Sequence, residues 1–149
     1  MTIDRDAKKV TAERVIAAPA EKIFDVLADP SMHSVIDGSG TVKGARGNSG
    51  RLSLGSKFGM SMKAGVPYVM KNTVVEFEEN RRIAWWHMAH NIWRYELEPV
   101  EGGTRVTETF DWSKSRASWM LFNSPEHNDE GIEKTLERLD RFVTTGSPE

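Results

Sequence analysis

Between Arg82 and Trp112 the chain contains three short segments in which large apolar side chains recur at every second position. Successive side chains of a β-strand point to opposite faces of a sheet, so each segment predicts a strand with one apolar face. The sequence Glu101-Gly102-Gly103-Thr104 predicts a turn before the third strand. The three faces comprise Ile83, Trp85 and His87; Trp93, Tyr95 and Leu97; and Val106, Glu108, Phe110 and Trp112. Adjacent strands of this kind would form one large apolar wall, covered by a packed helix, by a bound molecule or by both.

A long amphipathic helix is predicted near the end of the chain. Ser124-Pro125-Glu126 is typical of a helix start, because serine can cap, proline fits the first turn and an acidic side chain suits the positive end of the helix dipole. Gly146 predicts the end of this helix. Apolar positions recur with helical spacing at Ile132, Leu136, Leu139, Phe142 and Val143.

A strand and a first helix are predicted near the beginning of the chain. Lys9 to Ala17 alternates in polarity, as a strand does. Ala18-Pro19 predicts a helix start, and Glu21 suits the positive end of that helix. The buried stripe of this helix is predicted to be Ile23, Phe24 and Leu27.

A short helical segment and further strands follow. Asp29-Pro30 ends the first helix and can cap a second one over Ser31 to Ile36, which carries His33. Strands are predicted over Gly40 to Ala45, Arg51 to Met62 and Tyr68 to Glu78. Within the second of these strands, one face carries Phe58, Met60 and Met62. Both faces of the third carry apolar residues, so its inward face stays open.

The order of elements predicts an α+β fold, in which a curved antiparallel sheet of about six or seven strands grips the long C-terminal helix. Two short helices follow the first strand. The length of 149 residues suits one domain, and the absence of cysteine excludes disulfides and thiolate chemistry. A net charge of -2 gives no electrostatic basis for nucleic-acid binding. No apolar run approaches the roughly 20 residues that cross a bilayer, and we expect a cytoplasmic protein.

Several stretches resemble the START-like helix-grip superfamily (SRPBCC), in its polyketide cyclase/dehydrase and lipid-transport branch. They are Val15 to Pro30, Gly55-Ser56-Lys57-Phe58, Val75 to Trp85 and Leu97 to Thr107. The resemblance implies that residues 1–149 form a single helix-grip domain with a cavity between the sheet and the C-terminal helix. In the family such a cavity usually holds a hydrophobic ligand, and no catalytic motif carries over. A tryptophan often found near Val35-Ile36 is absent here.

Glu108 and His87 are the candidate catalytic residues. Alternation places Glu108 among apolar side chains, so its pKa should rise unless a cation or a donor pairs with it, and such carboxyls can act as general acids or bases. Alternatively, a bulge turns Glu108 to solvent, or an arginine or tyrosine pairs with it. His87 could approach Tyr95 or Glu108 to bind a ligand or move a proton. Alternatively, a neighbouring hydroxyl or carboxylate simply satisfies this histidine.

The leading hypothesis is a carrier or sensor that binds a hydrophobic or aromatic small molecule, lipid or polyketide-like, in an internal cavity. The second is a cyclase/dehydratase-type enzyme in which Glu108 and His87 move protons while the cavity excludes water. The third is a protein-interaction module, chaperone-activator-like or homodimeric, that uses Trp119 and Phe122. We expect no cofactor and no metal, because His87 and His90 would face opposite sides of a strand. The ligand-binding residues are predicted to be Phe24, Leu27, His33, Phe58, Met60, Met62, Trp85, His87, Trp93, Tyr95, Glu108, Phe110, Trp112 and Leu136.

Overall fold

In a computed structural model, the described part of the chain forms one antiparallel sheet of eight strands in the order β1-β2-β8-β7-β6-β5-β4-β3. The structure describes residues 2–4, 8–37, 42–46, 51–64, 66–86, 91–113 and 125–148. The strands are β1 (Thr2–Asp4), β2 (Lys9–Ile16), β3 (Val42–Arg46), β4 (Lys57–Ala64), β5 (Val66–Glu78), β6 (Arg82–Trp86), β7 (Ile92–Val100) and β8 (Gly103–Asp111). The helices are α1 (Ala20–Leu27), the 3₁₀ turn η1 (Pro30–Met32), α2 (His33–Ile36) and α3 (Pro125–Thr145). The predicted fold class is confirmed, and the three-residue edge strand β1 adds to the strands expected.

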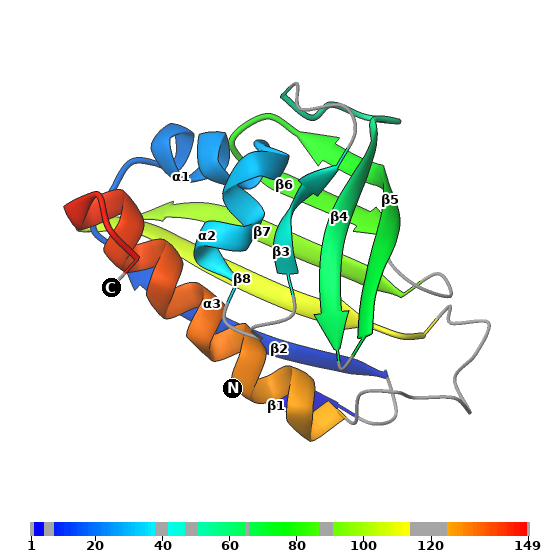
Figure 1. The fold of residues 1–149 in the computed structure, drawn as a ribbon. Coiled ribbons are helices and arrows are strands. Elements are labelled where there is room, and N and C mark those ends of the chain that lie inside the picture. The colour runs from blue at the N-terminus through cyan, green and yellow to red at the C-terminus, as the bar shows by residue number, and fades with distance from the viewer. Residues whose placement is uncertain are drawn as a thin grey trace.

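All three α-helices lie on the same side of the curved sheet, and α3 runs across β2 and β8 (Figure 1). The buried stripe of α3 is the predicted one, with Phe142 only partly buried. The helix ends as predicted at Gly146, whose backbone N–H donates to the carbonyl of Phe142 at 2.9 Å and whose φ is 86°. Among the described residues, no helix combines the length and apolarity needed to cross a membrane.

The register of the central strands brings the three predicted apolar faces together. Tyr95 pairs with Ile83 on one side and with Glu108 on the other, while Trp93 pairs with both Trp85 and Phe110. Paired residues on neighbouring strands point to the same side of a sheet, so these side chains share the face that the helices cover. The apolar wall predicted from alternation is therefore confirmed for the described residues.

Strand β5 explains why both faces of its sequence carry apolar residues. A shift of register between Val74 and Glu76 marks a β-bulge, which places one extra residue in the strand. The extra residue reverses the alternation, so Val74 belongs to the core and Phe77, three positions later, is partly buried and packs against the same core. On β5, the set of positions that point inward therefore shifts by one residue at the bulge.

The prediction that a strand begins at Arg51 is wrong, because β4 begins only at Lys57. The preceding residues form a loop that is bonded to other elements. The backbone N–H of Leu52 donates to the carbonyl of Ala28 at 2.8 Å, and the Leu52 side chain is buried. Gly55 then takes a left-handed conformation with φ 82°, which interrupts the extended backbone.

The predicted turn between β7 and β8 is confirmed, and both of its glycines are required by the backbone. Gly102 has a φ of 87°, a conformation that other residues rarely adopt. A Cβ atom at Gly103 would overlap the backbone carbonyl of Ile16 on the neighbouring strand β2. The turn therefore fixes the close approach of β2 and β8 as well as the hairpin.

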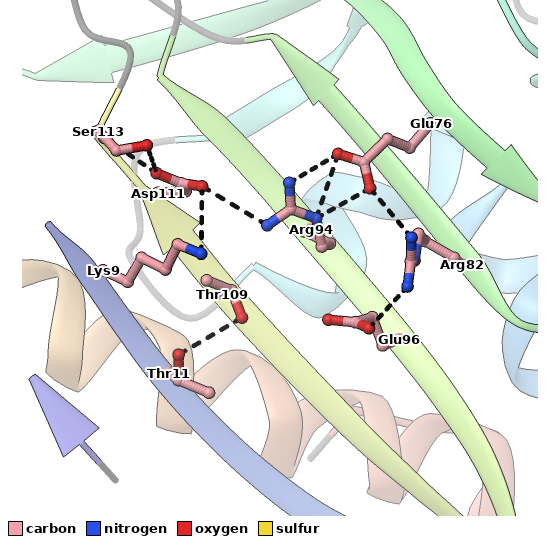
Figure 2. Close-up of polar contacts among 9 residues, drawn as sticks. All are labelled: Lys9, Thr11, Glu76, Arg82, Arg94, Glu96, Thr109, Asp111 and Ser113. Atoms are coloured by element: carbon pink, nitrogen blue, oxygen red, sulfur yellow. Dashed lines mark hydrogen bonds and ion pairs between the residues drawn. The ribbon is translucent and has the colours of Figure 1, made fainter. Parts of the chain in front are cut away.

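The outer face of the sheet carries a ladder of charged side chains centred on Arg94 (Figure 2). The Arg94 guanidinium donates to Glu76 at 2.6 Å and lies 3.6 Å from the carboxylate of Asp111. The hydrogen bond from Arg94 lowers the pKa of Glu76. The side chain of Arg94 is 17% exposed, so this pairing is partly shielded from water. The remaining charged members of the ladder are Lys9, Arg82 and Glu96.

Replacing Arg94 with methionine should destabilise the protein by about 2 kcal/mol, because Glu76 and Asp111 lose their closest cation and keep only the longer contacts to Arg82 at 3.7 Å and Lys9 at 3.9 Å. Arg105→Met is the matched control, since Arg105 pairs with Glu98 at 3.1 Å where both side chains are exposed. Exposed ion pairs are worth roughly 0–1 kcal/mol. Urea denaturation of both variants measures the difference. Equal losses of free energy of unfolding in the two variants would show that the Arg94 ladder does not stabilise the sheet.

Candidate functional site

The candidate site is built around Glu108, whose side chain lies on the inner face of β8. Its neighbours on that face of the strand are Val106 and Phe110, and Glu108 is itself only 2% exposed. The partner across the strand pair is Tyr95 of β7, whose hydroxyl lies near enough to the carboxyl group to oppose the rise of its pKa. Of the alternatives open from sequence, a tyrosine neighbour is the one observed, and the register of β7 and β8 shows no bulge that turns the side chain outward.

Burial controls the protonation of both members of this pair. Loss of hydration raises the pKa of Glu108 well above its ordinary value, the bond from Tyr95 opposes that rise, and the negative charge of Asp37 adds to it. Burial also raises the pKa of Tyr95, and the nearby carboxyl group raises it further. Glu108 is therefore a neutral acid over a wider pH range than an exposed glutamate. Its Oε1 atom is buried and has no hydrogen-bond partner among the described residues.

His33 of α2 is the second buried polar group on this side of the sheet. Its Nε2 atom lies 2.8 Å from the carbonyl oxygen of Leu27, at the end of α1. The ring stacks on Trp85 with a centroid distance of 4.9 Å and an interplanar angle of 17°. Phe58 meets the same histidine edge-on at 5.5 Å. Burial lowers the pKa of His33, because the charged imidazolium would lose its hydration among these rings.

One local contact and one long-range contact fix the segment that contains α2. The Asp29 carboxylate accepts a hydrogen bond from the backbone N–H of Ser31 at 3.0 Å, which confirms the predicted cap. From α3, the Arg138 guanidinium donates to the carbonyl oxygen of Val35 at 2.8 Å. Asp37, which follows α2 directly, acts electrostatically on Glu108, Tyr95 and the histidine alike. The end of α2 is thus placed close to all three buried groups.

Aromatic rings connect the two polar groups across the wall. The rings of Trp85 and Tyr95 lie 5.8 Å apart, and those of Trp93 and Phe110 lie 4.6 Å apart. Phe110 continues the row to Trp112 at 6.2 Å. Rings at such separations attract one another through edge and offset contacts, so the row is a rigid apolar surface. A surface of this kind suits an apolar or aromatic molecule better than a charged one.

The structure brings most of the predicted ligand-binding residues into one buried region. Eight belong to the hydrophobic core, namely Phe24, Leu27, Phe58, Trp85, Tyr95, Phe110, Trp112 and Leu136. Trp93 packs against that core, and His33 and Glu108 are its buried polar neighbours. Met60 and Met62 lie on β4, but the positions of their side chains fall outside what the structure describes. His87, Trp119 and Phe122 lie outside the described residues.

Two residues of the site were not singled out from sequence. Asp37 is separated from Glu108 along the chain, and only the folding of α2 onto the sheet lets its charge act there. Arg138 reads as an ordinary surface position of an amphipathic helix, yet it is half-buried and reaches a carbonyl of α2. No periodic pattern in the sequence predicts either contact. Within the described ranges, no cluster of three or more potential metal ligands occurs.

Sequence relatives cover most of this chain. The profile of the family described as polyketide cyclase / dehydrase and lipid transport matches residues 7–142. An uncharacterised protein of Mycobacterium tuberculosis strain H37Rv, Rv0088, is 36% identical over 145 residues, which cover 92% of this chain and 65% of the relative. A second uncharacterised protein, MT0096 of strain CDC 1551, is 35% identical with the same coverage. The chain thus spans 65% of the length of these curated relatives.

Solved structures share the fold at low sequence identity. A protein from Arthrobacter aurescens matches with a TM-score of 0.77 at 15% identity, over 98% of this chain and 92% of that one. An AHSA1-like protein from Aeromonas hydrophila gives 0.72 at 21% identity, over 95% of both chains. The Aha1 dimer from Colwellia psychrerythraea gives 0.68 at 19% identity, over 93% of this chain and 97% of that one. These likenesses establish the helix-grip architecture alone.

The buried carboxyl group predicts a specific dependence of stability on pH. Above the ordinary glutamate value of 4.5, Glu108 ionises in the unfolded chain while it keeps its proton in the folded one. The contribution of Glu108 to stability is therefore complete below that value and is lost as the pH rises toward the folded pKa. Glu108→Gln should remove this loss, at about 1.4 kcal/mol for each tenfold change in proton affinity.

Urea denaturation between pH 4.5 and 8 tests this, with Glu98→Gln as the control at an exposed position of the neighbouring strand. Glu76 and His33 have lowered pKa values, so they contribute the opposite slope and contribute it equally to each protein. The difference between wild type and Glu108→Gln isolates the buried group. Parallel pH profiles for the two would mean that Glu108 is ionised in the folded protein.

Proposed function

Because the chain belongs to the polyketide cyclase / dehydrase and lipid transport family, we propose that it binds a hydrophobic or aromatic small molecule between the curved sheet and its helices. The observation that carries this proposal is the buried carboxyl group of Glu108, which stands on a wall of aromatic rings with one oxygen unpaired among the described residues. Ligand carriage, lipid or polyketide-like, is the function that this arrangement supports best.

The free-energy cost of buried polar atoms without hydrogen-bond partners supports the proposal that a molecule binds here. A buried polar atom without a hydrogen-bond partner costs roughly 1–3 kcal/mol. Two such atoms, on Glu108 and His33, lie on the same side of the sheet. Small-molecule sites in proteins are commonly apolar with a few convergent polar groups that fix the orientation of the ligand. A ligand that supplied the missing partners would offset the cost of burying them.

Binding can be tested with the neutral fluorescent probe N-phenyl-1-naphthylamine. A probe held on the inner face should accept excitation energy from Trp85, which is 5% exposed, so Trp85→Phe should lower the transfer clearly. Trp86→Phe is the matched control, because Trp86 is adjacent in sequence and 39% exposed. Native mass spectrometry of the protein as purified tests for a co-purified apolar molecule. A protein that binds neither the probe nor any extractable apolar molecule would refute the proposal.

A second candidate is an enzyme of the cyclase/dehydratase type, and the neutral acid at Glu108 favours it. A carboxyl group whose pKa is raised by burial can donate a proton to a substrate carbonyl near neutral pH. His87, the other predicted catalytic residue, lies outside the described residues.

Glu108→Gln should then abolish turnover of a poly-β-ketone substrate, because the amide cannot transfer a proton but keeps the shape of the side chain. Binding of N-phenyl-1-naphthylamine to the same variant serves as the control for an intact site. Rates and product distributions equal to those of the wild type would exclude a catalytic role for Glu108.

Self-association is a separate proposal, supported by one structural neighbour that is described as a dimer. Size-exclusion chromatography with light scattering measures the mass in solution. A mass of 16.8 kDa at every concentration used would exclude a stable homodimer.

A further inference from the structure

The hydrogen bond to Leu27 fixes which nitrogen of His33 carries the proton. A carbonyl oxygen can only accept, so Nε2, which lies 2.8 Å from it, must be the donor. The pKa of His33 is lowered by burial, so the ring is neutral near pH 7 and holds one proton. Nδ1 therefore presents a lone pair. That atom is buried and has no hydrogen-bond partner among the described residues.

Glu108 presents the opposite character. A neutral carboxyl group carries one proton, and the neighbouring Tyr95 hydroxyl can donate to the oxygen that lacks it. The Oε1 atom is buried and has no partner in the described structure, so it presents a donor when it carries that proton. The site therefore offers one acceptor on α2 and one donor on β8.

The two atoms border the same aromatic surface. His33 stacks on Trp85 at 4.9 Å, and Trp85 lies 5.8 Å from Tyr95, which stands opposite Glu108 on the neighbouring strand. The carboxylate of Asp37 acts on both from the end of α2. Its negative charge disfavours any anion between them.

We propose that the site selects neutral apolar molecules carrying a hydroxyl or N–H group, bound by His33 Nδ1, and a carbonyl oxygen, bound by Glu108 Oε1. This inference rests on the proposed ligand-binding function and specifies the chemistry of the ligand. Neutral hydroxy-ketones and hydroxy-aryl ketones have this pair of groups. Fatty-acid carboxylates and phosphate esters do not, because neither side chain supplies a positive charge and Asp37 repels them.

Water is a poorer match than a ligand for the histidine nitrogen. An ordered buried water usually makes about three hydrogen bonds to polar groups. The aromatic rings of Trp85 and Phe58 beside His33 offer only weak acceptance from an O–H group. A ligand hydroxyl needs only one strong partner, because the rest of the molecule is satisfied by contact with the rings.

Three naphthalene probes test the selection. They are 6-hydroxy-2-acetylnaphthalene, which carries both groups, 2-acetylnaphthalene, which lacks the hydroxyl, and 6-hydroxy-2-naphthoate, which replaces the ketone with a carboxylate. Titration calorimetry should show the hydroxy-ketone binding wild type about fivefold to tenfold more tightly than the plain ketone, since one satisfied buried acceptor is worth roughly 1 kcal/mol or more. The carboxylate should bind at least tenfold more weakly than the hydroxy-ketone.

His33→Phe keeps a flat ring against Trp85 and removes the acceptor, so the preference for the hydroxyl should disappear while the plain ketone still binds. Nitrogen-15 NMR of wild-type His33 gives a readout that needs no variant. The Nδ1 resonance should be that of an unprotonated nitrogen and should shift with the hydroxy-ketone but not with the plain ketone.

The outcomes separate this inference from the function on which it rests. Equal binding of the two ketones, or an unchanged Nδ1 resonance, would overturn the selection by His33 and leave apolar ligand binding intact. Tighter binding of the carboxylate would overturn the preference for neutral ligands. If neither the three probes nor N-phenyl-1-naphthylamine bind, the proposed ligand-binding function itself is refuted.

Discussion

Burial of a neutral carboxyl group opposite a tyrosine is the constraint on which the inner face of this protein depends. An ionised carboxylate among aromatic rings would be strongly destabilising, so folding keeps the proton on Glu108 and places Tyr95 opposite it. That pairing requires β7 and β8 in their observed register. A slip of one residue would turn Glu108 to the outer face and bring the threonines of β8 inward. The carboxyl group therefore ties strand register to the chemistry of the site.

The two faces of the sheet handle charge in opposite ways. On the outer face, Arg94 lies between two carboxylates, and its hydrogen bond keeps Glu76 ionised by lowering that pKa. On the inner face, burial keeps both Glu108 and His33 neutral. The charged ladder holds the strands together from outside without placing a cation near the rings. A neutral interior beside an aromatic row is suited to uncharged guests, which is why we favour ligand carriage over an ionic partner.

Much of the architecture could be predicted from periodicity alone. The alternating segments ending at Trp112 and the apolar stripe of α3 are long repeats, so their buried faces follow directly from the sequence. The bulge at Val74 could not be predicted, because a single inserted residue reverses the alternation without leaving a compositional mark. The residues before Lys57 read as a strand, but their backbone bonds to α1 and turns at Gly55. There, a long-range contact rather than the local sequence pattern determines the backbone conformation.

The site could be predicted only in part, because some of its features also depend on long-range contacts. Glu108 stood out because a charged residue interrupted an apolar face, whereas the unpaired nitrogen of His33 follows from one hydrogen bond to Leu27 that no spacing encodes. The most direct test of the account is the carbon-13 resonance of the Glu108 carboxyl group, followed across pH with and without bound N-phenyl-1-naphthylamine. The account predicts a protonated carboxyl well above the ordinary glutamate range and a further upward shift of its pKa when the probe binds, because an apolar neighbour disfavours the ionised form. An ordinary titration that the probe leaves unchanged would contradict it.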